Sequence, residues 1–179
     1  IQRLNRGLDP ASHDEAVRKI LRLDSPSLIA NNESFHDLLV QGVTVELAGK
    51  KGETVYPCVK LVDFDKPEDN DFLVVNQYSI KESKQARRPD IIVFVNGLPL
   101  AVFELKNAGN ENAGIDQAVA QLQTYRLKDN IPSLFHYNAL LVASDGLQAR
   151  VGTVTAGKER FARWRTADGE SEAANTDLE

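Results

Sequence analysis

The sequence predicts an α/β fold in which a mixed β-sheet is flanked by helices. Two runs of β-branched and aromatic residues, 91–95 and 98–105, flank the dipeptide Asn96-Gly97, and helical patterns lie before and after them. Of the 179 residues, 42% are hydrophobic, which is enough to bury a core. Asn-Gly is a strong hairpin signal because both residues tolerate positive φ. Neither run alternates cleanly between apolar and polar residues, so we expect a central hairpin covered on both faces.

Three helices are predicted around this hairpin. The first is expected at 12–23, opened by a capping-box pattern that begins at Ser12. The second is expected to be capped by Asn31 or Asn32 and to end at Gly42. Its inward-facing residues should be Phe35, Leu38 and Leu39.

The third helix is expected at 114–128, with an apolar stripe along one side. That stripe consists of Ile115, Ala118, Val119 and Leu122. Besides the hairpin, strands are expected at 43–47, 55–64, 72–80, 139–143 and 148–151. Strands and helices interspersed in this way predict a mixed sheet with helices packed against it.

Charged residues stand at the ends of the two apolar runs. Asp90 precedes the first run, and Glu104 and Lys106 end the second. Burying such groups is costly unless they pair or bind a metal ion. Glu104 and Lys106 are two residues apart and share one face of their strand. A plain two-residue turn would place Asp90 and Glu104 on opposite faces, so a shared site is expected to need a three-residue loop or a bulge.

The pattern Pro-Asp, strand pair, Glu-x-Lys fits metal-dependent hydrolysis of a phosphodiester. The carboxylates of Asp90 and Glu104 and the main-chain carbonyl of Leu105 are hard oxygen ligands, which suit Mg²⁺. Lys106 could orient the attacking water or neutralise developing charge. The alternative interpretation is a salt bridge between Lys106 and one of these carboxylates at a strand end.

Gln121 and Tyr125 form a second polar pair. They are four residues apart on the predicted helix at 114–128 and therefore lie on one flank of it. An amide and a phenol there can hydrogen-bond a carboxylate, a metal-bound water or a phosphate. The alternative is a tyrosine at the edge of the core beside a solvated glutamine.

Several segments, in chain order, resemble the N-terminal nuclease domain of the motor (R) subunit of type I restriction enzymes. This domain is similar to the RecB-like branch of the PD-(D/E)xK nucleases. The matching segments are 31–36, 69–72, the hairpin, 121–125, 131–137 and 159–166. The resemblance implies a restriction-endonuclease-like core. Its implied catalytic set is Asp90, Glu104 and Lys106, with Gln121 and Tyr125 as the accessory motif.

The resemblance also implies cofactors and partners. The metal would be Mg²⁺, for which Mn²⁺ can substitute, and the substrate would be double-stranded DNA. A methyltransferase subunit and a specificity subunit would complete the complex, and the specificity subunit would read the DNA sequence. Motor domains of the same full-length chain would hydrolyse ATP, because no phosphate-binding loop pattern occurs in this sequence.

The domain organisation is expected to be a nuclease domain at 1–167 followed by an acidic linker at 168–179. The sequence contains no methionine and begins with isoleucine, so we expect a fragment of a longer chain. The net charge is −5, and five of the 26 acids lie in that linker. The remaining 21 acids equal the 21 bases, so the domain without the linker is expected to be neutral.

Basic residues cluster immediately before the hairpin. Such a cluster can hold the phosphate backbone near a carboxylate site, although an ordinary solvated loop is the alternative. Its members are Lys81, Lys84, Arg87 and Arg88. Around Phe161 and Trp164 lies a second basic segment, where we expect Trp164 to anchor against protein rather than stack on bases.

Further residues and alternatives complete the prediction. Glu33, on the second helix, is a candidate for an additional metal ligand, with a solvated residue near the helix cap as the alternative.

Cys58 is the single cysteine, which excludes a disulfide framework and fits a cytoplasmic protein. No apolar run is long enough for a membrane span. Competing functions are a DNA-binding or motor-docking module without catalysis, and a repair exonuclease.

Overall fold

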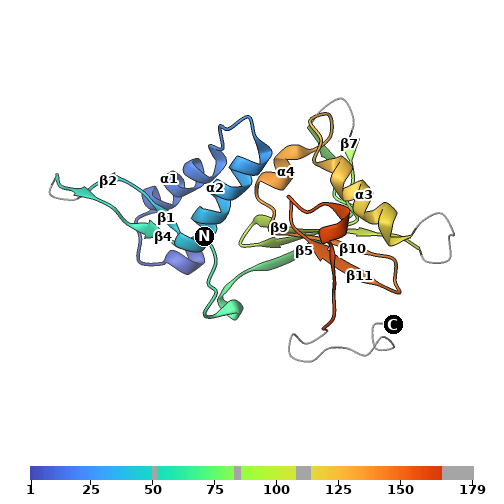
Figure 1. Cartoon of the computed structure of the whole chain (residues 1–179). Helices are drawn as coiled ribbons and strands as arrows, with labels where there is room; N and C mark the ends of the chain where they lie inside the picture. Colours follow the sequence, from blue (N-terminus) through green and yellow to red (C-terminus); the bar gives the residue numbers. More distant parts are fainter. Residues whose placement is uncertain (50–51, 83–85, 108–113, 167–179) are drawn as a thin grey trace. The chain divides into compact units, whose positions relative to one another are not determined.

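The computed structural model describes residues 1–49, 52–82, 86–107 and 114–166 (Figure 1). The chain divides into two compact units, each described here by itself. Unit 1 comprises Ile1–Leu73 and Phe94–Leu98, and unit 2 comprises Val74–Val93 and Pro99–Glu179. The expected acidic linker at 168–179 lies outside the described residues, and the single domain at 1–167 stays a prediction. The mixed α/β fold class is confirmed.

The first helix of unit 1, α1 (Pro10–Leu21), begins earlier than predicted. Its cap is Asp9, whose carboxylate accepts a hydrogen bond from the Ala11 main-chain N–H at 2.9 Å. Pro10 occupies the first helical position, where its missing N–H costs nothing and its fixed φ suits the helix. The predicted cap at Ser12 is therefore wrong, and Ser12 is buried within the first turn.

The second helix, α2 (Leu28–Gln41), is capped by Ser27 rather than by Asn31 or Asn32. The side chain of Asn31 instead bonds both main-chain polar groups of Ser25. Gly42 ends the helix as predicted, with φ +79°. A Cβ there would lie 2.7 Å from Cys58 Sγ. Of the predicted inward-facing residues, Phe35 and Leu39 are buried and Leu38 is half-buried.

The strands of unit 1 are shorter than predicted. β1 (Val43–Thr44) pairs with β4 (Cys58–Val59), and β2 (Leu47–Ala48) pairs with β3 (Thr54–Val55), both antiparallel. The run predicted at 55–64 is interrupted because Pro57 has no N–H and the N–H of Lys60 donates to Asn5 Oδ1. The remaining short elements are η1 (Gln2–Asn5) and η2 (Pro67–Asp69).

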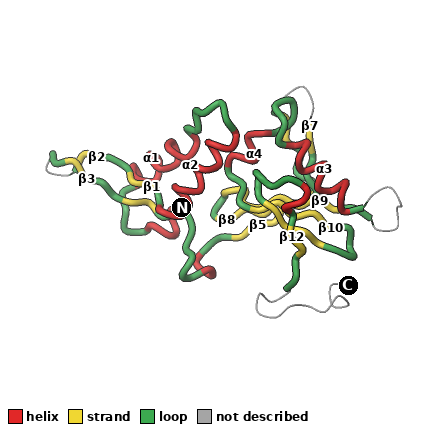
Figure 2. The backbone as a smooth tube through the Cα atoms, in the orientation of Figure 1, coloured by secondary structure: helices red, strands yellow, loops and turns green. Residues whose placement is uncertain are grey.

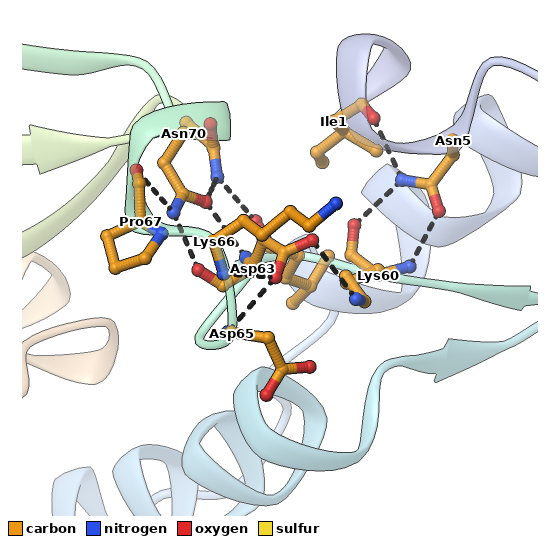
Figure 3. Close-up of polar contacts among 10 residues, drawn as sticks. Ile1, Asn5, Lys60, Asp63, Asp65, Lys66, Pro67 and Asn70 are labelled. Carbon is orange, nitrogen blue, oxygen red and sulfur yellow. Dashed lines mark hydrogen bonds and ion pairs between the residues drawn. The ribbon is translucent and has the colours of Figure 1, made fainter.

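Side chains hold the connection between β4 and the next strand (Figure 3). The Asp63 carboxylate accepts hydrogen bonds from the main-chain N–H groups of Asp65 and Lys66 and pairs with Lys60 at 3.2 Å. The Lys66 hydrogen bond is the largest cause that lowers the pKa of Asp63. Asn70 donates to the Asp63 carbonyl and accepts from the Asp63 N–H. This loop is therefore fixed without regular secondary structure.

Most residues of a six-stranded mixed sheet, in the order β12-β11-β10-β9-β8-β5, belong to unit 2 (Figure 2). β10 runs parallel to β9 and antiparallel to β11, and β11 runs antiparallel to β12. The predicted hairpin, β8 and β9, is interior to the sheet as expected. The bounds are β5 (Phe72–Asn76), β8 (Ile91–Val95), β9 (Leu98–Leu105), β10 (Leu140–Ser144), β11 (Ala149–Gly152) and β12 (Ala162–Arg163).

Helix α3 (Ile115–Tyr125) packs against β10 (Figure 1), and its predicted apolar stripe is buried. Shorter elements escaped prediction because one helical turn or two strand residues carry no readable periodicity. Among them are α4 (Pro132–His136), η3 (Lys158–Arg160), and the hairpin of β6 (Ile80–Lys81) and β7 (Ala86–Arg87).

Candidate functional site

The turn between β8 and β9 consists of two residues. Asn96 has φ +52° and Gly97 has φ +85°, so both central residues are left-handed. β8 ends at Val95 and β9 begins at Leu98. The three-residue loop is therefore not formed, which leaves the other expected geometry, a bulge beside Asp90.

Asp90 reaches the end of β9 because it lies in a bend ahead of β8 rather than within a strand. Its Oδ2 accepts a hydrogen bond from the Leu105 main-chain N–H at 2.8 Å. Its own carbonyl accepts from the Gln77 N–H, also at 2.8 Å, and Gln77 is itself left-handed with φ +50°. Strand parity, on which the expectation about the turn rested, does not apply to a residue in a bend.

Glu104 is the most buried charged group of the site, with 1% of its surface exposed. Its Oε1 accepts a hydrogen bond from Lys106 Nζ at 2.8 Å. Burial raises the pKa of Glu104, and the charge of Asp90 raises it further, whereas Lys106 and Tyr125 lower it. Two carboxylates therefore lie close enough to interact, next to one ammonium group.

Helix α3 completes a closed ring of hydrogen bonds around Glu104. Lys106 Nζ donates to Gln121 Oε1 at 2.7 Å, and Gln121 Nε2 donates to the Tyr125 hydroxyl at 2.6 Å. The Tyr125 hydroxyl donates to Glu104 Oε2 at 3.4 Å. Burial is the main cause that raises the pKa of Tyr125, which keeps the phenol protonated and able to donate.

The geometry brings together the five side chains that the sequence singled out for the site. Asp90, Glu104 and Lys106 come from the hairpin, and Gln121 and Tyr125 come from one flank of α3. The spacing of four residues places the glutamine and tyrosine one turn apart, facing the end of β9. Their roles in catalysis stay predictions.

The donor set suits a hard divalent cation. It offers two carboxylates and, next to Glu104, the carbonyl of Leu105, a residue that is 43% exposed. No group of three or more histidine, cysteine or acidic side chains with metal-binding geometry occurs among the residues described. Glu33 is exposed on α2 of unit 1, and its approach to a metal in unit 2 stays a prediction.

The basic cluster before the hairpin is only partly solvated. Lys81 and Arg88 are exposed, whereas Arg87 is half-buried and its Nε donates to Asn130 Oδ1. Lys84 lies outside the described residues. A DNA-binding role for the cluster stays a prediction.

One contact near this cluster was not predicted. The Glu82 carboxylate accepts hydrogen bonds from the Ser133 main-chain N–H at 3.0 Å and from the Ser133 hydroxyl at 2.5 Å. It therefore ties the segment between β6 and β7 to the first turn of α4. No sequence signal pairs residues 51 positions apart.

Comparison with known proteins identifies the family. Residues 1–160 match the family described as "Type I restriction enzyme R protein N terminus". The chain is 42% identical over 175 residues, 97% of its length, to the type I restriction enzyme HindI endonuclease subunit of Haemophilus influenzae. It is 33% identical over 96% of its length to the putative MjaIXP endonuclease subunit of Methanocaldococcus jannaschii. The chain spans 16% of the length of each of these two relatives.

The membrane prediction concerns helices alone. Within the described ranges, no helix is both long and apolar enough to cross a bilayer.

Taken together, the match over residues 1–160 and the two relatives place this chain in the family of type I restriction enzyme R proteins, in their N-terminal region.

Proposed function

We propose that this chain is the nuclease domain of a type I restriction R subunit and cleaves phosphodiester bonds of double-stranded DNA with Mg²⁺. The observation that carries the proposal is the closed ring of Glu104, Lys106, Gln121 and Tyr125, with Asp90 beside it. An ordinary strand-end salt bridge needs only Lys106 and one carboxylate. A second carboxylate raises the cost of burying Glu104, which fits a cation-binding role better than a structural one.

In this proposal each residue has a separate task. Asp90, Glu104 and the Leu105 carbonyl would hold Mg²⁺, or Mn²⁺ in its place, and the metal would supply Lewis-acid stabilisation of the phosphate and lower the pKa of a water. Lys106 orients the attacking water and balances charge on the phosphate. Gln121 fixes the Lys106 ammonium, and Tyr125 fixes Glu104, so both are positioning residues.

We propose the partners on the basis of family membership. The relatives are named as endonuclease subunits, and this chain covers only a small part of them. We propose that motor domains of the same full-length chain supply ATP-driven translocation. Methyltransferase and specificity subunits would complete a cytoplasmic complex, with sequence recognition in the specificity subunit.

The test uses isosteric variants in the complete R subunit, assembled with its partner subunits. Asp90→Asn and Glu104→Gln remove the charges that bind the cation but keep side-chain volume. We expect cleavage to be abolished and ATP hydrolysis to be unchanged. Glu15→Gln, which removes a half-buried acid paired with Arg18 in unit 1, is the matched control.

The runner-up function is a DNA-binding or docking module without catalysis. The observation in its favour is that Lys106 and Tyr125 already occupy both oxygens of Glu104. Cleavage that persists in both isosteric variants, or ATP hydrolysis lost together with cleavage, would support that alternative. A repair exonuclease would degrade linear DNA from its ends without cutting closed circles.

A further inference from the structure

One residue next to the candidate site is held in a strained backbone conformation. Gln77 directly follows β5 and has φ +50°. A left-handed backbone is uncommon for residues other than glycine, asparagine and aspartate, and it persists only where the surrounding structure imposes it. Asn96 is the other left-handed non-glycine residue among those described, and its tight turn accounts for it. Gln77 lies between β5 and β6 and in no hairpin turn, so its conformation has a different cause.

The strands on either side of Gln77 keep one register. The Gln77 N–H donates to the Asp90 carbonyl at 2.8 Å, and further along the chain Ile80 pairs with Arg87. Ile80 lies three positions after Gln77, and Arg87 lies three positions before Asp90. Counting from one pair therefore reaches the other without an inserted residue. The two antiparallel segments change direction here and keep their register.

Gln77 and Asp90 are opposed bends in these two segments. Each lies in a bend rather than in a regular strand. Strands joined by main-chain hydrogen bonds must bend together, because the donor of one has to follow the acceptor of the other. The left-handed Gln77 therefore allows Asp90 to leave strand geometry while its carbonyl stays hydrogen-bonded.

The Asp90 carboxylate uses this bend to reach β9. Its Oδ2 accepts a hydrogen bond from the Leu105 N–H at 2.8 Å. The next N–H along the chain, that of Lys106, donates to the Ser144 carbonyl in β10. Successive N–H groups of an extended chain point to opposite sides, so the Leu105 N–H points toward β8, the other neighbour of β9. The carboxylate takes the place that a main-chain carbonyl of β8 would have in a regular ladder.

The side chain of Gln77 does not explain the strained backbone. It is exposed, so no packing in a core holds the residue in place. Its main-chain N–H, by contrast, is fixed by the Asp90 carbonyl. A non-glycine residue in a left-handed conformation next to a candidate site is the kind of local strain that functional sites retain.

We propose that Gln77 is a positioning residue for Asp90, and that its left-handed backbone, not its side chain, fixes the carboxylate that would hold Mg²⁺. The inference rests on the proposed nuclease function, in which Asp90 is a metal ligand. Outer groups that orient a metal ligand typically change metal affinity or activity about 10- to 100-fold. Any residue that tolerates a left-handed backbone should then serve at position 77.

The first measurement is amide hydrogen exchange by NMR on the metal-free 179-residue chain, so it does not depend on cleavage. The Leu105 amide reports the position of the Asp90 carboxylate, because Leu105 is 43% exposed and its N–H loses protection when that acceptor moves away. Gln77→Thr introduces a β-branched residue, which resists a left-handed backbone. We expect the Leu105 amide to exchange about tenfold faster in Gln77→Thr, and at the wild-type rate in Gln77→Gly. Asn76→Thr, which changes an exposed amide side chain of β5 in the same way, is the matched control.

A reference amide separates a local effect from unfolding. Leu122 is buried in α3, and its amide should exchange at the same rate in the wild type and in every variant. If Gln77→Thr also speeds exchange at Leu122, Gln77→Asn decides the question. Asparagine favours a left-handed backbone more than glutamine does, so the Leu105 amide should then exchange several-fold more slowly than in the wild type. An equal or faster rate in Gln77→Asn would contradict the inference.

The second measurement is the Mg²⁺ dependence of cleavage by the complete R subunit with its partner subunits. Gln77→Thr should raise the Mg²⁺ concentration at half-maximal rate about 10- to 100-fold, while the rate at saturating Mg²⁺ approaches that of the wild type. Gln77→Gly should restore the wild-type dependence. A loss of folded protein would instead lower the rate at every Mg²⁺ concentration without shifting the half-maximal point.

Two results would overturn the role of Gln77. One is an unchanged Leu105 exchange rate in Gln77→Thr while Leu122 stays protected. The other is an equal effect of Gln77→Gly and Gln77→Thr, which would assign the effect to the side chain. Both leave the nuclease proposal standing, since that proposal is tested by cleavage in the isosteric carboxylate variants. Faster Leu105 exchange in Gln77→Thr together with normal cleavage by Asp90→Asn would contradict the nuclease proposal and, with it, the assignment of Asp90 as a metal ligand.

Discussion

Oδ2 of Asp90 accepts a hydrogen bond from the main-chain N–H of Leu105 at 2.8 Å, across 15 residues of sequence. This contact brings a residue that precedes β8 to the residue that ends β9. The carbonyl of the same Asp90 is held by Gln77, a left-handed residue just beyond β5. Three strands thus fix one carboxylate, which is the kind of support that a metal ligand requires.

Lys106 gives the first prediction. Lys106→Ala removes the group that donates to both Glu104 and Gln121, so cleavage by the complete complex should fall about 10²- to 10³-fold. Lys106→Arg should not restore it, because a planar guanidinium cannot take the place of a compact ammonium. Single-turnover cleavage assays measure both. Lys60→Ala, which removes another ion-paired lysine, should cleave normally.

Tyr125 gives the second prediction. Tyr125→Phe removes the hydroxyl that donates to Glu104 and accepts from Gln121 but keeps the buried ring. Outer hydrogen-bond partners of metal ligands typically contribute about 10- to 100-fold, so we expect a loss of this size in the rate or in the apparent affinity for Mg²⁺. Activity measured against Mg²⁺ concentration distinguishes the two. The matched control is Tyr137→Phe. Tyr137 also has a raised pKa, but it does not belong to the hydrogen-bonded ring around Glu104.

The third prediction concerns Asn96, whose side chain does more than permit the turn. Its Nδ2 donates to the Leu61 carbonyl at 2.9 Å and to Asn70 Oδ1 at 2.8 Å. Asn96→Asp replaces the donating amide by a carboxylate, which would lie next to both acceptor oxygens. The free energy of unfolding should therefore fall by about 2–3 kcal/mol. Asn96→Gly keeps the left-handed backbone and should cost less. Urea denaturation measures both, and equal losses would contradict a role for the amide donor.

The fourth prediction concerns pH. Burial lowers the pKa of His136 below its ordinary value of 6.5, although Glu82 opposes this effect. A lowered pKa means that the folded state disfavours the protonated ring. The contribution of neutral His136 to the free energy of unfolding is therefore fully present above pH 6.5, and it is lost as pH falls through the folded pKa. His136→Gln should flatten the dependence of Tm on pH below 6.5. An unchanged profile would assign the acid sensitivity to other groups.

Much of the site could be read from the sequence because its signals are local. Asn96-Gly97 encodes its turn, Glu104 and Lys106 are neighbours on one strand, and Gln121 and Tyr125 are one helical turn apart. The residue pattern groups Asp90 with Glu104, but the three-residue loop, one of the two geometries expected for this grouping, is not formed. A bend ahead of a strand leaves no periodic signal, so its geometry could not be derived from alternation.

The features that escaped prediction depend on contacts between distant segments. The cap of α1 moved from Ser12 to Asp9 because Pro10 can start a helix, which a capping-box pattern alone does not reveal. The contact between Glu82 and Ser133 carries no sequence signal, since it joins segments 51 positions apart. Register between non-adjacent segments is decided by the folded sheet, not by local propensity.

The last prediction concerns the 179-residue chain without its partners. Two carboxylates and one carbonyl are an incomplete shell for Mg²⁺, so DNA phosphate should contribute much of the metal affinity. A chain with net charge −5 also lacks a broad electrostatic attraction for DNA. We therefore expect weak binding that falls steeply with salt, and little or no cleavage by this chain alone. Filter binding and plasmid cleavage across a salt series measure these properties, and efficient sequence-specific cutting by the chain alone would contradict delivery and recognition by other parts of the complex.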